Sequence, residues 1–208
     1  LIEYKKLAQK YPLSKEGVQA QLMIAFIYYL QLDYDNTVYD LNKFIAKYPS
    51  HENIDYAYYL LALSNYEQIS NEELDGTYNN QALENFNNLI NRFPKSKYTK
   101  DSLQKIILIN ENIAAKNMNI GRFYQDKNKN VAALNRYKIV IKEHSTSKFV
   151  PEALYRMVEI YFKLGFEDDA IKSASTIGFN YPDSKWYKYA YNLVNKENIN
   201  KNGISIPK

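Results

Sequence analysis

The stretch from Pro151 to Pro182 constrains the fold more than any other part of the chain. Apolar residues at helical spacing mark two successive amphipathic helices in it: Leu154, Met157, Val158 and Tyr161 in the first, and Ala170, Ala174 and Ile177 in the second. Gly165 lies in the turn between them, and Pro182 ends the second helix because proline cannot continue one. The stretch therefore predicts a hairpin of two helices, each with an apolar face to bury.

A helix hairpin of about 34 residues, with a small residue where its helices cross closely, is typical of the tetratricopeptide repeat. Each hairpin buries only part of its apolar surface internally, so a neighbouring copy must cover the rest. One copy therefore predicts others along the chain. We expect an all-α fold, a tetratricopeptide-repeat superhelix (an α-solenoid) made of antiparallel helix pairs.

The closing turns of the copies share one chemistry. An aromatic residue or a histidine precedes a proline or serine, and a serine follows. The turns are Tyr11–Ser14, Tyr48–Ser50, Phe93–Ser96, His144–Ser147 and Tyr181–Ser184. In the last four turns we expect Ser50, Ser96, Ser147 and Ser184 to cap the helix that follows, because a serine hydroxyl can accept a hydrogen bond from a free backbone N–H.

These turns divide residues 1–195 into the repeats of a single domain. We predict the second helix of a truncated first repeat at 1–14, the second repeat at 15–50, the third at 51–96, the fourth at 97–147, the fifth at 148–184 and a capping helix at 185–195. The polar residues 196–208 predict a flexible tail. Since the chain starts in mid-helix pattern without a methionine, we expect that the natural N-terminus has been removed.

Two repeats depart from the standard length. The third has a polar surplus around Ser70 to Asn80, which predicts a longer loop. In the fourth, no proline occurs from Tyr98 to Asp126, and the apolar residues keep a helical period. This stretch predicts one long helix, or two helices with a slight kink near Ala114 to Asn117.

Composition excludes several kinds of site. The chain has no cysteine, so disulfides, thiolate metal sites and cysteine nucleophiles are ruled out for these residues. The net charge of +4 comes from lysines and arginines that are spread along the chain, which does not indicate nucleic-acid binding. The longest apolar run, Leu22 to Leu30, is too short to span a bilayer.

Candidate catalytic or metal-binding residues are few. His51 and His144 lie at repeat junctions without a partner at ligand spacing, so a capping or surface role is favoured. The acidic stretches Glu72–Asp75 and Glu167–Asp169 fit a loop and a helix N-terminus, where carboxylates are favourable. We find no phosphate-binding loop and no nucleophile elbow. We therefore expect no catalytic residue, no metal and no cofactor.

The chain has 21 tyrosines, and most occupy positions inside the repeats. A further set falls on the face that a solenoid turns inward, on the first helices of the second and third repeats: Leu22, Phe26, Tyr29, Tyr56, Tyr59 and Tyr66. Tyrosine supplies rigid contact area that is apolar with a polar tip, which suits binding sites. Two interpretations stay open: these residues line a peptide-binding groove, or neighbouring helices cover them.

Five stretches of the chain are more specific than a general repeat pattern. They are Tyr48–Tyr56 (YPSHENIDY), Phe93–Tyr98 (FPKSKY), Ile120–Tyr124 (IGRFY), Ala133–Tyr137 (ALNRY) and Pro182–Tyr187 (PDSKWY). Together with the longer loop and the long helix, they resemble the BamD family, outer-membrane lipoproteins of the β-barrel assembly machinery of Gram-negative bacteria. Two features depart from the family: the loop is shorter, and the lipid-bearing N-terminal cysteine is not among these residues.

The resemblance implies a non-enzymatic scaffold that binds BamA and unfolded outer-membrane protein precursors for their folding and membrane insertion. It implies the periplasmic face of the cell outer membrane, reached through an N-terminal lipid anchor, and other assembly-machinery lipoproteins as further partners. The N-terminal half would bind the C-terminal strands of the precursors through the inward-facing residues named above.

The C-terminal half would, by the same resemblance, dock on the periplasmic domains of BamA. The residues implied are Arg122, Arg136, Tyr137, Phe149 and Tyr155. Arginine can pair with carboxylates through two hydrogen bonds, which suits such an interface. An equal alternative for Arg136 is that it braces its own helix pair.

Two other classes of function stay in view. Another periplasmic tetratricopeptide adaptor, such as one that coordinates cell division with envelope growth, would share the closing turns. It would not be expected to keep the Asn53–Tyr56 stretch or the long helix of the fourth repeat. The other class is an enzyme, which a pair of buried carboxyl groups with strongly shifted pKa values in a cleft would favour.

Overall fold

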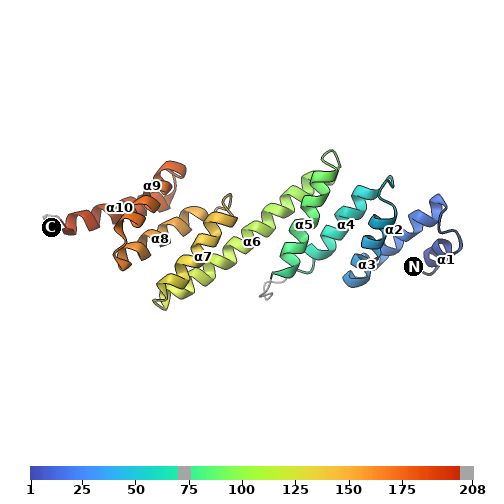
Figure 1. Ribbon diagram of the computed structural model, residues 1–208, viewed down its shortest axis with the longest axis horizontal. Helices are drawn as coiled ribbons and strands as arrows, with labels where there is room; N and C mark the ends of the chain where they lie inside the picture. The colour runs from blue at the N-terminus through green and yellow to red at the C-terminus, as the bar shows by residue number, and fades with distance from the viewer. Residues whose placement is uncertain (70–75, 202–208) are drawn as a thin grey trace. The chain divides into compact units, whose positions relative to one another are not determined.

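The computed structural model describes residues 1–69 and 76–201, and within these ranges the chain forms α-helices and no strand (Figure 1). The helices are α1 (Ile2–Lys10), α2 (Lys15–Leu30), α3 (Tyr34–Lys47), α4 (Ile54–Tyr66), α5 (Thr77–Arg92), α6 (Thr99–Asp126), α7 (Asn130–Glu143), α8 (Val150–Leu164), α9 (Glu167–Asn180) and α10 (Lys185–Lys201). The prediction of an all-α fold of helix pairs is confirmed. Nowhere in the described ranges does a helix combine the length and the hydropathy that a bilayer crossing needs.

The chain divides into two compact units, unit 1 from Leu1 to Ile109 and unit 2 from Asn110 onward. In unit 1, each of α1 to α4 packs against the helix that follows it, and α2 also touches α4. In unit 2, α7 packs on α8, α8 on α9, and α10 on both α8 and α9. The long helix α6 contributes its first part to unit 1 and the remainder to unit 2.

The core of unit 1 comes from the apolar faces of α2, α3 and α4. Its largest fully buried side chains in these helices are Leu22, Leu41, Phe44 and Leu60, and the small residues Ala25 and Ala57 let the helices approach closely. Burying one such large side chain stabilises the fold by about 1.5–3 kcal/mol. The pairing of successive helices in unit 1 therefore rests on residues at helical spacing, as the sequence pattern predicts.

The core of unit 2 repeats this arrangement in α6 to α10. Met118, Tyr137, Val158 and Ile177 are almost completely buried, and Ala133, Ala153 and Ala170 have no exposed surface.

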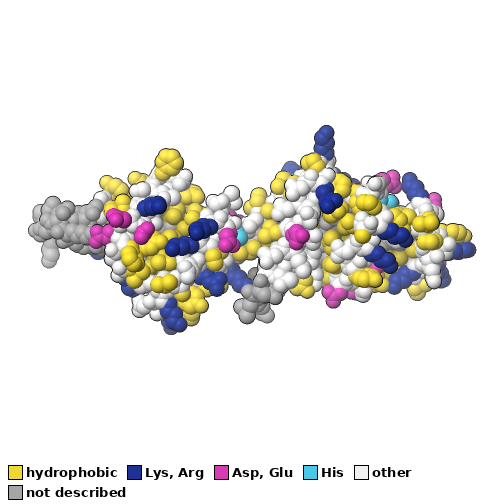
Figure 2. Space-filling model, viewed as in Figure 1, with side chains coloured by type: hydrophobic (Ala, Val, Ile, Leu, Met, Phe, Trp, Pro, Cys, Tyr) yellow, Lys and Arg dark blue, Asp and Glu magenta, His cyan; other side chains and the backbone are white. Residues whose placement is uncertain are grey.

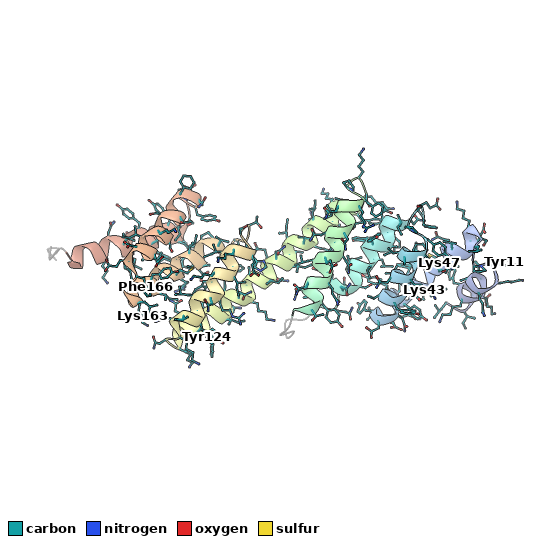
Figure 3. All side chains as sticks on the ribbon, viewed as in Figure 1. Tyr11, Lys43, Lys47, Tyr124, Lys163 and Phe166 are labelled. Carbon is teal, nitrogen blue, oxygen red and sulfur yellow. The ribbon has the colours of Figure 1, made fainter. Side chains whose placement is uncertain are left out.

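Gly165 ends α8 with φ of 77°, a left-handed conformation that favours glycine. Lys163, which Figure 3 labels, lies at the same end of α8. Its ammonium donates to the Asn128 amide oxygen at 2.5 Å, which joins α8 to the turn after α6.

Several details of the elements differ from the sequence-based predictions. The stretch from Tyr98 to Asp126 holds one helix, α6, so the alternative of two helices is not observed. α10 continues to Lys201, beyond the predicted end of the capping helix at residue 195. The predicted long loop ends at Gly76, since α5 begins at Thr77. Residues 70–75 of this loop, and most of the predicted tail, lie outside the described residues.

The serines of the closing turns follow two patterns. The Ser184 hydroxyl accepts from the Tyr187 N–H at 3.1 Å at the start of α10, as predicted, and Ser14 caps α2 in the same way. The cap prediction is wrong for Ser96 and Ser147, which precede their helices by three residues and accept instead from the residue two positions on. It is also wrong for Ser50, because Asn53 occupies the position before α4.

Candidate functional site

A row of aromatic rings crosses unit 1 where α2, α4 and the start of α6 meet. Phe26 lies on α2, Tyr56 and Tyr59 lie on α4, and Tyr98 directly precedes α6. The two positions on α4 are three residues apart and so share one face of the helix. We call Phe26, Tyr56, Tyr59 and Tyr98 the aromatic row.

The rings of the aromatic row contact one another in sequence. The centroids of Phe26 and Tyr56 are 6.3 Å apart, and those of Tyr56 and Tyr98 are 5.5 Å apart. Tyr59 stacks on Tyr98 at 4.6 Å with an interplanar angle of 15°. All four side chains are partly exposed, so each is partly packed against the protein and partly accessible to a ligand.

An acidic residue and a lysine hold the far end of the row. The Tyr59 hydroxyl donates to Asp101 Oδ2 at 2.6 Å, and Lys105 Nζ lies 3.2 Å from the same oxygen. The Lys105 ammonium also lies 5.3 Å from the centroid of the Tyr66 ring, within reach of a cation–π interaction. These contacts tie α4 to α6 and restrict the rotation of the Tyr59 ring.

The environment raises the pKa of two hydroxyls of the row, those of Tyr56 and Tyr59. Burial raises the pKa of Tyr56 to about 12, and the neighbouring Tyr98 adds to the shift. Burial also raises the pKa of Tyr59, and the hydrogen bond to Asp101 raises it further. The row is therefore a set of uncharged rings, in which the Tyr59 hydroxyl is already engaged with Asp101.

The remaining predicted groove residues are placed differently. Tyr29 pairs with Tyr34 at 6.0 Å, and Tyr66 lies against Phe86 at 6.3 Å; both are partly exposed. The assignment of Leu22 to a binding surface is wrong, because its side chain is 1% exposed and belongs to the core between α2, α3 and α4. A buried leucine cannot touch a ligand while the fold is intact.

Sequence reasoning did not assign Tyr98, Asp101 or Lys105 to this site. Asp101 lies 42 residues from Tyr59, so no local pattern joins them. The available signal was the spacing of Asp101 and Lys105, because residues four apart on a helix share one face and can form an ion pair.

Unit 2 contains a network of charged and polar side chains between α6 and α8. Glu152 Oε1 accepts from Arg122 Nε at 3.0 Å and lies 2.9 Å from Arg122 Nη2. Arg156 Nη1 donates to Glu159 Oε2 at 3.0 Å, and the same oxygen accepts from the Gln125 amide at 3.1 Å. The Glu152 side chain is 12% exposed, so its pairing with Arg122 offsets a desolvated charge.

An aromatic cluster adjoins this network where α8 meets α10. The Tyr155 ring lies 5.4 Å from Trp186 and 5.8 Å from Tyr189. The Arg156 guanidinium lies within 6 Å of the centroids of both Tyr155 and Trp186. Burial raises the pKa of Tyr155 to about 12, and Glu159 contributes in the same direction.

The predicted BamA-binding residues are only partly brought together. Arg122 belongs to the network and Tyr155 adjoins it. Arg136 Nη1 instead donates to Asn117 Oδ1 at 3.3 Å, and Phe149 lies at the start of α8. The assignment of Tyr137 to a surface is wrong, since its side chain is 0% exposed and its hydroxyl donates to Gln125 at 2.8 Å. Sequence reasoning placed Trp186 in a family-like stretch but did not assign it to this surface, although it is the single tryptophan of the chain.

Comparisons with known proteins agree on one family. The family model described as "YfiO: Outer membrane lipoprotein" matches residues 2–177. The outer membrane protein assembly factor BamD of Rickettsia prowazekii is 44% identical over 192 residues, which cover 92% of this chain and 76% of that protein. BamD of Caulobacter vibrioides is 33% identical over 196 residues, which cover 94% of this chain and 64% of that protein.

More distant proteins are similar over comparable lengths. BamD of Neisseria meningitidis serogroup A is 29% identical over 198 residues, which cover 90% of this chain and 74% of that protein. Among solved structures, a thermophilic TPR protein of Thermus thermophilus is 17% identical with a TM-score of 0.33, over 85% of this chain and 99% of that one.

Proposed function

The chain belongs to the YfiO family of outer membrane lipoproteins, and from this premise we propose that it is a non-enzymatic scaffold of the outer-membrane β-barrel assembly complex. In this role unit 1 binds unfolded outer-membrane protein precursors and unit 2 binds BamA. The protein acts at the periplasmic face of the outer membrane, where an N-terminal lipid anchor holds it. The relatives named outer membrane protein assembly factor support this function over that of another periplasmic adaptor.

The aromatic row of unit 1 is the observation that carries the client-binding part of this proposal. It offers uncharged, partly exposed rings that their neighbours hold in place, so little freedom is lost on the receptor side when a ligand binds. A terminal strand that alternates apolar residues and ends in an aromatic one can lay its apolar side chains on such rings. The strand is unordered before assembly, so its ordering cost keeps the affinity modest.

A fluorescence titration with a terminal-strand peptide tests the client site. The Tyr29→Ala, Tyr59→Ala double variant should bind the peptide about tenfold more weakly, because aromatic anchors carry most of the binding energy of an interface. The matched control is Tyr4→Ala, Tyr191→Ala, which removes two tyrosines that are 38% and 57% exposed and lie outside the row. Equal affinity of all three proteins, with unchanged circular dichroism, would remove Tyr59 of the row and the neighbouring Tyr29 from client recognition.

A second variant separates the ring of Tyr59 from its hydroxyl. Tyr59→Phe keeps the stacking on Tyr98 and removes only the hydrogen bond to Asp101. If the peptide lies on the rings, this variant should keep most of the affinity that Tyr59→Ala loses. Equal loss in both variants would mean that the Tyr59–Asp101 contact, rather than the ring face, supports binding.

The Arg136 side chain is partly exposed, which supports docking of BamA on unit 2. Arg136 makes one hydrogen bond to a neutral amide, which leaves other guanidinium donors for a partner carboxylate. We expect Arg136→Glu to weaken binding to the periplasmic domains of BamA about tenfold, since it replaces attraction by repulsion. Surface plasmon resonance on immobilised BamA domains measures the effect.

The control for this experiment is Asn117→Ala. It removes the partner of Arg136 within unit 2 and keeps the arginine charge. If Arg136 contacts BamA, the control should bind as the unaltered protein does. If both variants lose affinity and thermal stability to the same extent, Arg136 only braces α6 against α7.

A further inference from the structure

A second groove in unit 1 lies between α1, α2 and α3 and shares no residue with the aromatic row. Its volume is about 520 Å³, within the range of small-molecule sites. Lys5 reaches it from α1, while Lys43 and Lys47 reach it from α3; the latter two are labelled in Figure 3. Figure 2 shows several Lys and Arg side chains among apolar ones over the region of these three helices.

The three lysines bring positive charges that repel one another to the lining of one groove. Lys43 and Lys47 are one helical turn apart on α3, a spacing at which like charges destabilise a helix. Within the described part of the chain, none of the three forms a salt bridge. Asp40 is the single carboxyl group in the groove lining, so it can offset only one of the three positive charges.

The remaining walls suit a polar anion with an attached organic part. Lys5 Nζ donates to the Tyr28 hydroxyl at 2.6 Å, which holds the ammonium over the floor of the groove. Ile24 and Phe44 supply an apolar floor. Tyr39, one turn before Lys43 on α3, is 65% exposed at the rim, so its ring is open to a ligand.

We propose that this groove binds a phosphate-bearing anion, which Lys5 holds from one side and Lys43 and Lys47 hold from the other. Ammonium groups bind phosphate as point charges, and three of them around one position suit oxygens that point in several directions. A planar carboxylate is matched better by the fork of an arginine, and no arginine lines this groove. The ligand is the headgroup of an anionic phospholipid or a free phosphate.

This inference does not depend on client or BamA binding. The chain belongs to a family of outer membrane lipoproteins, which a lipid anchor attaches to the membrane. A lipid headgroup bound in this groove would be a second contact with the membrane surface. Such a contact would orient unit 1 at the membrane. Its electrostatic attraction would weaken as the salt concentration rises.

Two binding measurements on the full chain distinguish the sources of phosphate. One is calorimetric titration with inorganic phosphate. The other is co-flotation with phosphatidylcholine vesicles that contain or lack phosphatidylglycerol. If the protein binds the phosphatidylglycerol vesicles but not inorganic phosphate, the ligand is a lipid headgroup. If it binds both, phosphate itself is sufficient. Either result supports the proposal when the variants described next respond as expected.

The test variant is Lys43→Gln, Lys47→Gln, and the matched control is Lys138→Gln, Lys142→Gln on α7. Both remove two positive charges at the same spacing on an α-helix. We expect the α3 variant to bind about tenfold more weakly and the α7 variant to bind as the unaltered protein does. Lys5→Gln, on the opposite wall, should also weaken binding. Equal binding by all proteins, or no binding to either probe, would overturn the proposal.

Discussion

At the scale of single residues, one glycine determines how α6 and α7 pack. A Cβ atom at Gly121 would lie 2.5 Å from Cε1 of the Tyr137 ring, far inside van der Waals contact. The ring cannot move aside easily, because it is completely buried and its hydroxyl is bound to Gln125. The absence of a side chain at residue 121 thus allows the largest fully buried side chain of unit 2 to fill the crossing.

The substitution Gly121→Ala tests this packing. Alanine favours a helix over glycine by about 1 kcal/mol, so an uncrowded site would be stabilised. Here overpacking costs about 1–3 kcal/mol, and we expect the free energy of unfolding in urea to fall on balance. The double variant Gly121→Ala, Tyr137→Leu should lose less than the sum of the single changes, because the shorter side chain relieves the clash. A more stable Gly121→Ala protein would contradict this account.

At the scale of elements, the α8–α9 hairpin shows how one helix pair is built. Ala170 on α9 is 0% exposed within the cluster that Val158 and Ile177 also form. Its small side chain leaves room for the helices to approach. The hairpin turn at Gly165 then reverses the chain with a left-handed residue.

We expect Ala170→Leu to destabilise the protein by about 1–3 kcal/mol, because the added carbons have no space at the crossing. Differential scanning calorimetry should show a lower Tm. Ser175→Leu on the same helix is the control, since Ser175 is exposed and the larger side chain meets little resistance there. An unchanged Tm for Ala170→Leu would mean that α8 and α9 are not packed as described.

At the scale of the whole molecule, buried and partly buried tyrosines couple the folding of the chain to alkaline pH. Burial raises the pKa of Tyr56 in unit 1, and of Tyr137 and Tyr155 in unit 2, to about 12 in each case. A tyrosine of the unfolded chain ionises near pH 10. Between about pH 10 and pH 12 the folded protein therefore holds more protons than the unfolded chain.

Below about pH 10 the ionisation of these tyrosines should consequently not affect the free energy of unfolding. As the pH rises toward about 12, the free energy of unfolding should fall. Urea denaturation at about pH 8 and about pH 11.5 measures the difference. Tyr155→Phe should show a smaller decrease than the unaltered protein, whereas Tyr191→Phe, at an exposed position, should not. Identical decreases in both variants would show that the alkaline loss comes from other groups, such as the lysines.

The helix pairs followed from local pattern. Apolar spacing, the glycine turn and the closing prolines act within one or two turns of chain, so the order of helices and the burial of Ala170 could be predicted without a structure. The aromatic character of the α2 and α4 faces was also visible. Each of these features depends on residues that are close together in the sequence.

The sites themselves depended on contacts between distant segments. Leu22 and Phe26 belong to one apolar helix, yet packing of α3 and α4 buries the first and leaves the second partly open. Tyr59 is oriented by Asp101, and Tyr155 by Trp186, across loops and whole helices. In a helix that is apolar on most of its surface, the neighbouring helices select which face remains accessible, and that selection is a property of tertiary packing rather than of local spacing.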